Sequence, residues 1–205
     1  MKIVFDTREY LEKVWNIAER ISIDSHITTQ FKGGMLYSAL NICDAMQDLI
    51  QKRNFVSANI LFRSLLEYVF RGYWLSRVAS EDEVAKAMNG DEWPKTKKLH
   101  ESIAGENAVI DVLASEKLKI KNILDSYIHG GSQNPLGQLG NEGHIEPNIP
   151  DSEVSYLLYI IQLSAYVTLF EMAQLSESRE IEHEIILIME ELVGERKNVS
   201  DLFSV

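Results

Sequence analysis

Residues 55–79 limit the fold more than any other stretch of the chain, because they are apolar around the whole circumference of a helix. Apolar side chains fall on opposite sides of that helix: Phe55, Leu66 and Tyr73 on one, and Leu61, Leu65 and Val69 on the other. A helix of this composition is normally wrapped by other helices. The stretch therefore predicts the central helix of an all-α bundle.

Three charged residues interrupt this apolar helix at a spacing of four, so that they share one stripe: Arg63, Glu67 and Arg71. A charge on a buried helix must be paired or must line a cavity, because an unpaired buried ion costs several kcal/mol. Two interpretations stay open. The stripe is either an anion or nucleotide pocket, in which Glu67 orients the arginines, or a structural ladder of ion pairs. Phe70 and Trp74 flank it as pocket wall or, more in keeping with their apolar character, as core.

Composition narrows the class of protein. The net charge of −11 argues against a general binder of nucleic acid or anionic membranes, since such proteins collect Lys and Arg. Cys43 is the single cysteine, which excludes an internal disulfide and favours a reducing cytoplasm. Its apolar helix face predicts a small buried residue, and the first ten residues lack the apolar core of a signal peptide. We expect a cytoplasmic protein.

Helical periodicity accounts for nearly the whole chain, and we expect one domain over residues 1–205 with about seven or eight helices. The predicted parts are an N-terminal helix over 6–29, a core bundle over 35–175 and a C-terminal helix over 178–194. Gly33 and Gly34 are expected to interrupt the pattern. The core bundle is predicted to comprise helices over 35–53, 55–79, 80–90, 96–104, 106–114, 116–129 and 152–174.

Residues 154–170 form a run of 17 uncharged residues, the lower limit for a membrane span. Four polar side chains share one face of this helix, however: Ser155, Tyr159, Gln162 and Tyr166. The flanks are acidic and lack the Lys and Arg that orient a span. A second buried helix is the better interpretation, so no membrane contact is expected. Tyr159, Gln162 and Tyr166 of this face are candidate ligand-binding residues.

Residues 129–151 hold five of the eleven glycines and three of the four prolines. Loops of this length in compact domains are usually functional or disordered. Its aliphatic residues suggest that the loop packs as a flap over one end of the bundle; they are Leu136, Leu139, Ile145 and Ile149.

His129 ends a predicted helix, where the helix dipole favours a protonated imidazole, and Asp125 one turn earlier could pair with it. Its neighbours complete a candidate ligand-binding segment: Tyr127, Gly130, Gly131 and Gln133. The alternative is a helix end capped by glycine, which explains Gly130 alone. Glu142 and His144 do not have the spacing of a standard metal site, and we predict no metal and no cofactor. Six lysines form basic spots that favour a solvated surface over an RNA track: Lys95, Lys97, Lys98, Lys117, Lys119 and Lys121.

Two segments together, RSLLEYVFRGYWL at 63–75 and YIHGGSQ at 127–133, resemble bacterial all-α families of unknown function that border the HEPN superfamily. The resemblance covers about residues 35 to 170. It implies a bundle of four or more helices, usually dimeric, in a superfamily that includes toxin, CRISPR-associated and anti-phage RNA endonucleases. Those nucleases cut RNA without metal, using a histidine and an arginine on one helix. His129 matches the histidine, whereas Asn122, Ile123 and Leu124 occupy the positions open to the arginine.

Three functional hypotheses follow, and whether the protein is an enzyme stays open. The first is a metal-independent ribonuclease of toxin–antitoxin or anti-phage type, with His129 as general acid and base. Arg63 or Arg71, oriented by Glu67, would stabilise the phosphorane. The second is a non-catalytic module that binds RNA, a small anionic ligand or a protein partner, as an antitoxin or sensor. The third is an acidic scaffold in which the stripe is purely structural. A homodimer is expected from the resemblance.

Overall fold

The computed structural model describes residues 2–90, 93–129, 131, 133–140, 144–176 and 178–196, in which every regular element is a helix. The all-α class predicted from the sequence is therefore confirmed for the described residues. In chain order the helices are α1 (Lys2–Ala18), α2 (Ile27–Gln51), α3 (Phe55–Arg77), α4 (Glu81–Met88), α5 (Thr96–Ile103), α6 (Ala108–Ile128), α7 (Gln133–Leu136), α8 (Asp151–Ser176) and α9 (Arg179–Arg196).

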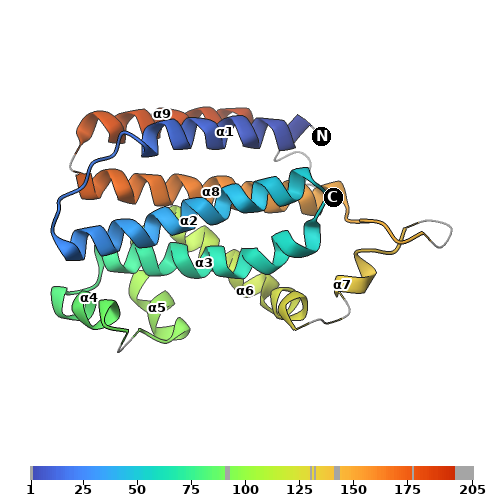
Figure 1. The fold of residues 1–205 in the computed structure, drawn as a ribbon, viewed down its shortest axis with the longest axis horizontal. Coiled ribbons are helices and arrows are strands. Elements are labelled where there is room, and N and C mark those ends of the chain that lie inside the picture. The colour runs from blue at the N-terminus through green and yellow to red at the C-terminus, as the bar shows by residue number, and fades with distance from the viewer. Residues whose placement is uncertain are drawn as a thin grey trace.

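Three long helices, α2, α3 and α8, form the centre of the bundle (Figure 1). α1 and α9 cover α8 on one side, while α5 and α6 pack against α3 on the other. α2 turns directly into α3 at Arg53, whose φ of 59° is left-handed, and Asn54 then caps α3 by accepting a hydrogen bond from the Ser57 N–H. Gly72 lets these two helices approach, because a Cβ at that position would lie 2.7 Å from Leu36 Cδ2.

α3 is central but not surrounded, which corrects the expectation of burial on all sides. Its buried residues include Phe62, Leu66 and Phe70. A continuous strip nevertheless reaches solvent, and this strip contains Ile60 and Tyr68. The apolar residues of α3 therefore do not all enter the core, because no helix covers that strip in the described part of the chain.

The N-terminal third differs most from the prediction. One helix over 6–29 was expected, but α1 begins at Lys2 and ends at Ala18, and α2 begins at Ile27. The predicted interruption at Gly33 and Gly34 is also wrong, since both lie inside α2. Gly33 is buried there against the side chain of Ile23, so the glycine makes room for packing and not for a turn.

The region between α3 and α6 follows the predicted signals in part. The capping box of Ser80 and Glu83 is present, and α4 is followed by Gly90 with a φ of 75°. α6 is one continuous helix, whereas two helices divided at Ser115 were expected. Asn107 starts α6 by accepting hydrogen bonds from two backbone N–H groups, and Ser115 lies exposed in mid-helix. A single Ser in a helix interior carries only a small propensity penalty, too small to end a helix that packs on two others.

α8 is long and apolar enough to cross a membrane by length and composition, yet 78% of its most apolar 18-residue window is buried inside the bundle. Its contacts are with α1, α2, α3, α6 and α9. Burial inside the bundle accounts for the apolar composition of α8 without a membrane, in agreement with the interpretation of the sequence.

The chain between α6 and α8 contains the short helix α7 and an isolated antiparallel bridge between Leu139 and Ile145. This segment extends away from the end of the bundle (Figure 1). The expectation that its aliphatic residues pack is wrong for three of them, because Leu136, Leu139 and Ile145 are exposed. Ile149, close to the start of α8, does pack against the core.

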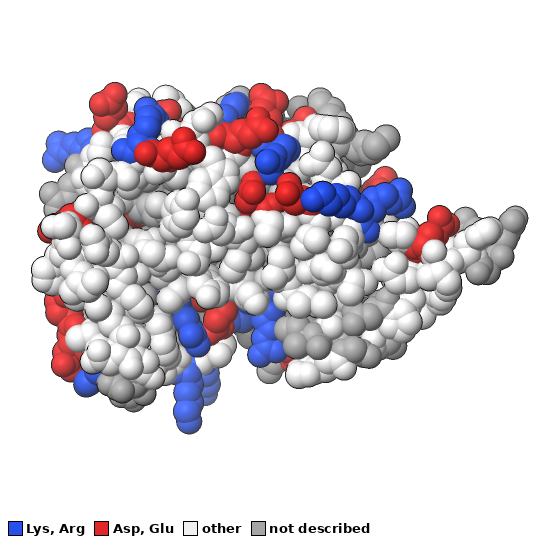
Figure 2. Space-filling model, viewed as in Figure 1, with Lys and Arg blue, Asp and Glu red and all other residues white. Residues whose placement is uncertain are grey.

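Charged side chains gather along the edges of the molecule, and a broad uncharged area lies over α2 and α3 between them (Figure 2). The edge near α1 combines Arg8 with two acids of α2, Asp44 and Asp48, at 2.8 Å and 3.3 Å. The charges therefore meet each other at the borders between helices and leave one face free of them.

Candidate functional site

The stripe Arg63, Glu67 and Arg71 lies on the side of α3 that faces α6. It is not buried as the sequence suggested, because about a third or more of each arginine side chain is exposed. The stripe instead forms one wall of a half-open charged region. We call the set Arg63, Glu67, Arg71 and Lys117 the α3–α6 charge cluster.

Glu67 is the centre of the cluster. One carboxylate oxygen lies 2.8 Å from Arg71 Nε, and the other accepts a hydrogen bond from Lys117 Nζ at 3.3 Å. The Lys117 side chain is only 13% exposed, and its ammonium also lies 5.1 Å from the centre of the Phe70 ring. Burial lowers the pKa of Lys117, and Arg63 and Arg71 lower it further, while Glu67 opposes both effects. Two cations therefore share one acid, and Arg63 places a third positive charge near Lys117.

Two aromatic groups and a histidine border the cluster. The Arg71 guanidinium stacks 4.6 Å above the Trp93 ring, which lies 6.3 Å from the Trp74 ring. His100 on α5 packs edge-on against Phe70 at 4.8 Å. Its Nε2 is buried and has no hydrogen-bond partner among the described residues. Burial, followed by the charge of Lys117, lowers the pKa of His100, and Glu67 opposes both effects; the net shift favours the neutral imidazole.

Arg63 connects α3 to the last turn of α6. Its Nη1 donates to Asp125 Oδ1 at 2.8 Å, so Asp125 pairs with α3, whereas pairing with His129 was anticipated. His129 caps α6 through its backbone N–H, which donates to the Asp125 carbonyl, and its side chain is exposed. Residues four apart on a helix are neighbours, so Arg63, Asp125 and His129 share one surface region.

Of the other predicted residues in the His129 segment, the structure describes the surroundings of Tyr127 and Gly131. Tyr127 is 95% buried, and burial raises its pKa. Gly131 is half-buried beyond the end of α6. Gly130 lies outside the described residues, and so does the side chain of Gln133, the first residue of α7.

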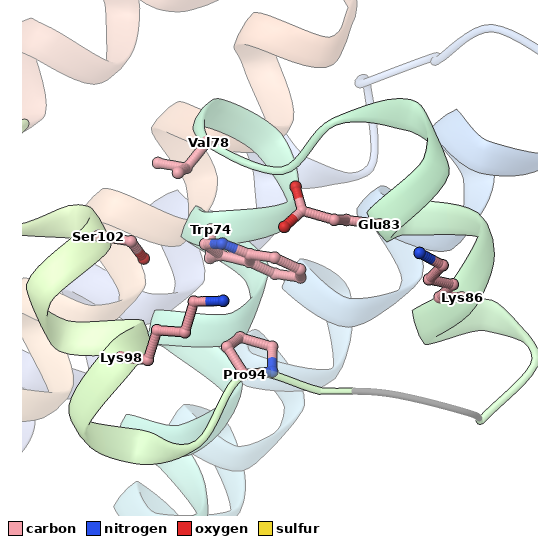
Figure 3. Close-up of a pocket in the computed structure, with 7 residues that line it drawn as sticks. All are labelled: Trp74, Val78, Glu83, Lys86, Pro94, Lys98 and Ser102. Carbon is pink, nitrogen blue, oxygen red and sulfur yellow. The ribbon is translucent and has the colours of Figure 1, made fainter.

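Trp74, a predicted ligand contact, lines a small pocket of about 210 Å³ at the corner of α3, α4 and α5 (Figure 3). Lys86 from α4 and Lys98 from α5 stand on either side of its ring. Glu83 also borders the pocket, but its carboxylate is occupied by Ser80 in the capping box. This pocket lies beside the α3–α6 charge cluster through the contact of Trp74 with Trp93.

The predicted polar face of α8 does not join the cluster. Gln162 is buried and donates to Thr7 Oγ1 at 3.0 Å, which ties α8 to α1. Tyr166 stacks on Phe170, and Tyr159 is partly buried against the core. The contacts of Gln162 and Tyr166 are structural contacts within the bundle.

Among known proteins, the model of one family matches residues 37–195, which is most of the chain. The chain belongs to DUF6988, a family of unknown function. No curated protein and no solved structure matches it. The DUF6988 range starts inside α2 and ends inside α9. It contains the whole α3–α6 charge cluster and His129 but leaves out α1.

Sequence reasoning missed two residues of this region: Lys117 in the charge cluster and His100 at its border. Lys117 was grouped with five other lysines as solvated surface, because its neighbours Glu116 and Lys119 make the local sequence look exposed. The side chains of Lys119 and Lys121 lie outside the described residues. His100 was not singled out, although it lies one residue after Leu99 and three before Ile103 on the apolar side of a short helix. That spacing is a signal that could have found it.

The described residues contain no group of three His, Cys, Asp or Glu side chains that could hold a metal ion. His144 is exposed, and Glu142 lies outside the described part of the chain. Cys43 is fully buried, and burial raises the pKa of its thiol, which fits the predicted small core residue.

Proposed function

We propose that this DUF6988 protein is a non-catalytic binding module and that its α3–α6 charge cluster binds a phosphate-bearing anion, with single-stranded RNA as the favoured ligand class. One observation supports this most: Glu67 is shared by two cations, Arg71 and the nearly buried Lys117, and Arg63, which pairs with Asp125, adds a third positive charge close to Lys117. The charge of a bound anion would favour the protonated form of Lys117 and offset the repulsion among the three cations.

The distribution of charge along the chain supports the same proposal. Residues 63–125 hold ten of the 20 Lys and Arg and eleven of the 31 Asp and Glu, so this part is nearly neutral. The remainder carries ten Lys and Arg against twenty acids. An anion that approaches the protein is therefore repelled least at the α3, α5 and α6 side.

The geometry suggests how the ligand would be held. Trp93 and Glu67 fix the plane of the Arg71 guanidinium and leave other N–H groups for a phosphate. Arg63 is half-exposed, so it can exchange part of its contact with Asp125 for a ligand oxygen. Trp93, which is half-buried beside Arg71, offers an aromatic ring on which a base can stack.

Isothermal titration calorimetry with a short single-stranded oligoribonucleotide, and with inorganic phosphate as the simple anion, tests the proposal. We expect Arg71→Gln and Lys117→Met each to weaken RNA binding about tenfold, which is about 1.4 kcal/mol. Lys52→Gln is the matched control, because Lys52 is an exposed cation at the far end of α2. Equal affinities in all variants, or no binding of either probe, would refute the proposal.

A second candidate is a metal-independent ribonuclease of HEPN-like type. The contact of Arg63 with Asp125 favours it, since this contact brings an α3 cation to within one helical turn of His129. His129 would take the 2′-hydroxyl proton as general base, and Arg63 would stabilise the charge that develops on the phosphorane. The Gly- and Pro-rich segment 129–151 would then act as a flap on bound RNA. A cytoplasmic toxin–antitoxin or anti-phage role would suit such an enzyme.

RNA cleavage in EDTA separates the two candidates. If the protein is a binding module, it binds RNA and leaves the RNA intact. If it is a ribonuclease, it produces RNA fragments, and the His129→Ala variant produces none. The exposed His144 provides a control, because His144→Ala removes a histidine from the neighbouring segment and should leave cleavage unchanged. Fragments that persist in His129→Ala would contradict the assignment of His129.

A further inference from the structure

We propose that the uncharged face of α2 and α3 binds a second copy of this chain and makes the protein a homodimer. This face consists of exposed and half-exposed residues of both helices. From α2 they are Ile27, Gly34, Ser38, Asn41, Ile42, Ala45 and Leu49, and from α3 they are Ser57, Ile60, Leu61, Ser64 and Tyr68. The inference is independent of the proposed anion site, which lies on the neighbouring side of α3.

The first argument is the apolar surface that the face exposes. Ile60 and Tyr68 are exposed by 41% and 37%, and Ile27 at the start of α2 by 59%. A shallow groove of about 460 Å³ lies between α2, α3 and α4 and is lined mainly by apolar residues. Its lining includes Ile27, Phe31, Gly34, Met35, Tyr68 and Met88, and no charged side chain belongs to it among the described residues. Contiguous exposed apolar surface of this kind usually marks an interaction site.

The second argument concerns charge and selects the occupant. Each copy carries a net charge of −11, so two copies repel each other wherever their charged edges would meet. The uncharged face is where two copies can approach without opposing like charges, since the acids and bases lie along its borders (Figure 2). It lacks the cations that a nucleic acid or an anionic membrane would require. An uncharged surface that meets its own copy brings no like charges together, which suits an isologous contact.

The third argument is size. From Ile27 to Leu49 the face is about 33 Å long at 1.5 Å per residue, and two helices make it about 20 Å wide. The resulting footprint of about 660 Å², roughened by side chains, approaches the ~800 Å² per partner of a standard interface. Gly34, Ser38 and Ala45 are small, so the second copy can come close to α2. With a two-fold axis across the helices, the Ile60 end of one copy faces the groove beside Tyr68 of the other.

Sedimentation equilibrium of the full chain at up to about 100 µM, well above the Kd of a weak dimer, tests the proposal. We expect the wild type to be dimeric. Ala45→Glu on α2 and Ser64→Glu on α3 should each produce a monomer, because each places a charge in the face. Both positions are exposed in the single chain, so the far-UV circular dichroism of the helices should not change.

Leu187→Glu is the matched control, because Leu187 is half-exposed on α9, and α9 packs on α8 away from α2 and α3 (Figure 1). This variant should remain dimeric. A monomeric wild type would overturn the proposal, as would dimers that persist in both Ala45→Glu and Ser64→Glu. Dissociation of Leu187→Glu to the same extent would also overturn it, since the effect would then not belong to the α2–α3 face.

Discussion

α3 carries ion pairs on two sides, and the two differ in their exposure to water. Toward α8, Arg77 Nε donates to Glu171 Oε2 at 2.6 Å, and the Glu171 side chain is 1% exposed. Toward α6, Glu67 is 29% exposed and shares its charge between Arg71 and Lys117. One side is a closed pair with a fully buried acid, and the other is an open cluster with a surplus of cations.

The comparison separates a structural ion pair from one that a ligand can enter. Burial raises the pKa of Glu171 even though Arg77 opposes this effect, which means that the fold pays a desolvation penalty for that carboxylate. Nothing outside the protein can reach it to compensate. In the α3–α6 charge cluster, Glu67 is partly exposed and is shared by two cations, so a bound anion could supply part of the negative charge that these cations need.

Arg77→Met should give the largest effect, because it leaves a buried carboxylate without its partner. We expect a loss of about 3–5 kcal/mol in the free energy of unfolding, measured by urea denaturation. Glu171→Gln should lose less, since the Arg77 side chain is 35% exposed and can turn toward water. If Glu171→Gln lowered the free energy of unfolding more than Arg77→Met, the burial of the Glu171 carboxylate would not be what makes this ion pair important for stability.

The pH dependence of Arg77→Met should reveal the same carboxylate. A native pKa above the unfolded value means that the native state binds the proton more tightly, so the charged form destabilises the fold at pH values above the native pKa. That destabilisation disappears as the pH falls through the native pKa toward the unfolded value. Without Arg77 the native pKa rises further, so the deficit relative to wild type should shrink as the pH falls from neutral toward the ordinary pKa of a glutamate, by at most about 1.4 kcal/mol per pH unit. Denaturation curves across this range measure it, and a deficit independent of pH would contradict it.

The sequence predicted the elements of the fold better than their boundaries. The run around α3, the apolar α8 and the capping box at Ser80 all depend on local patterns, and these are present as expected. The two glycines inside α2 misled the prediction because their role is tertiary: Gly33 is buried against Ile23, which no local pattern reveals. Ser115 misled it in the same way, since packing on α3 and α8 keeps α6 continuous.

The candidate site could be predicted only where it lies on one helix. The spacing of Arg63, Glu67 and Arg71 identified the α3 side of the cluster, because residues four apart on a helix share a face. Its α6 side depends on which helix packs beside α3, and Lys117 therefore looked like any surface lysine. The partner of Asp125 was misjudged for the same reason, since a long-range arginine was favoured over the local histidine.

Glu67→Gln tests the open side of the comparison and should have an intermediate effect. It leaves Arg71 and Lys117 without their shared counter-charge, and we expect a loss of about 1–2 kcal/mol at low salt. Inorganic phosphate should restore part of this stability, because an anion can take the place of the lost carboxylate. The same addition should not rescue Arg77→Met, whose defect is a buried acid. Urea denaturation with and without phosphate measures both, and equal responses of the two variants would remove the distinction between the two sides of α3.

The pair of Arg63 and Asp125 should contribute least to stability, although it lies closest to His129. Both side chains are more than a third exposed, and pairs of this kind are typically worth about 0.2–1 kcal/mol. A double-mutant cycle of Arg63→Gln and Asp125→Asn, measured by urea denaturation, should therefore give a coupling energy within that range. The same variants should move RNA binding in opposite directions, because Arg63→Gln removes a cation from the surface while Asp125→Asn frees it. A coupling energy as large as that between Arg77 and Glu171 would mean that the pair of Arg63 and Asp125 is structural. The part of α3 that a ligand can enter would then extend only as far as Glu67.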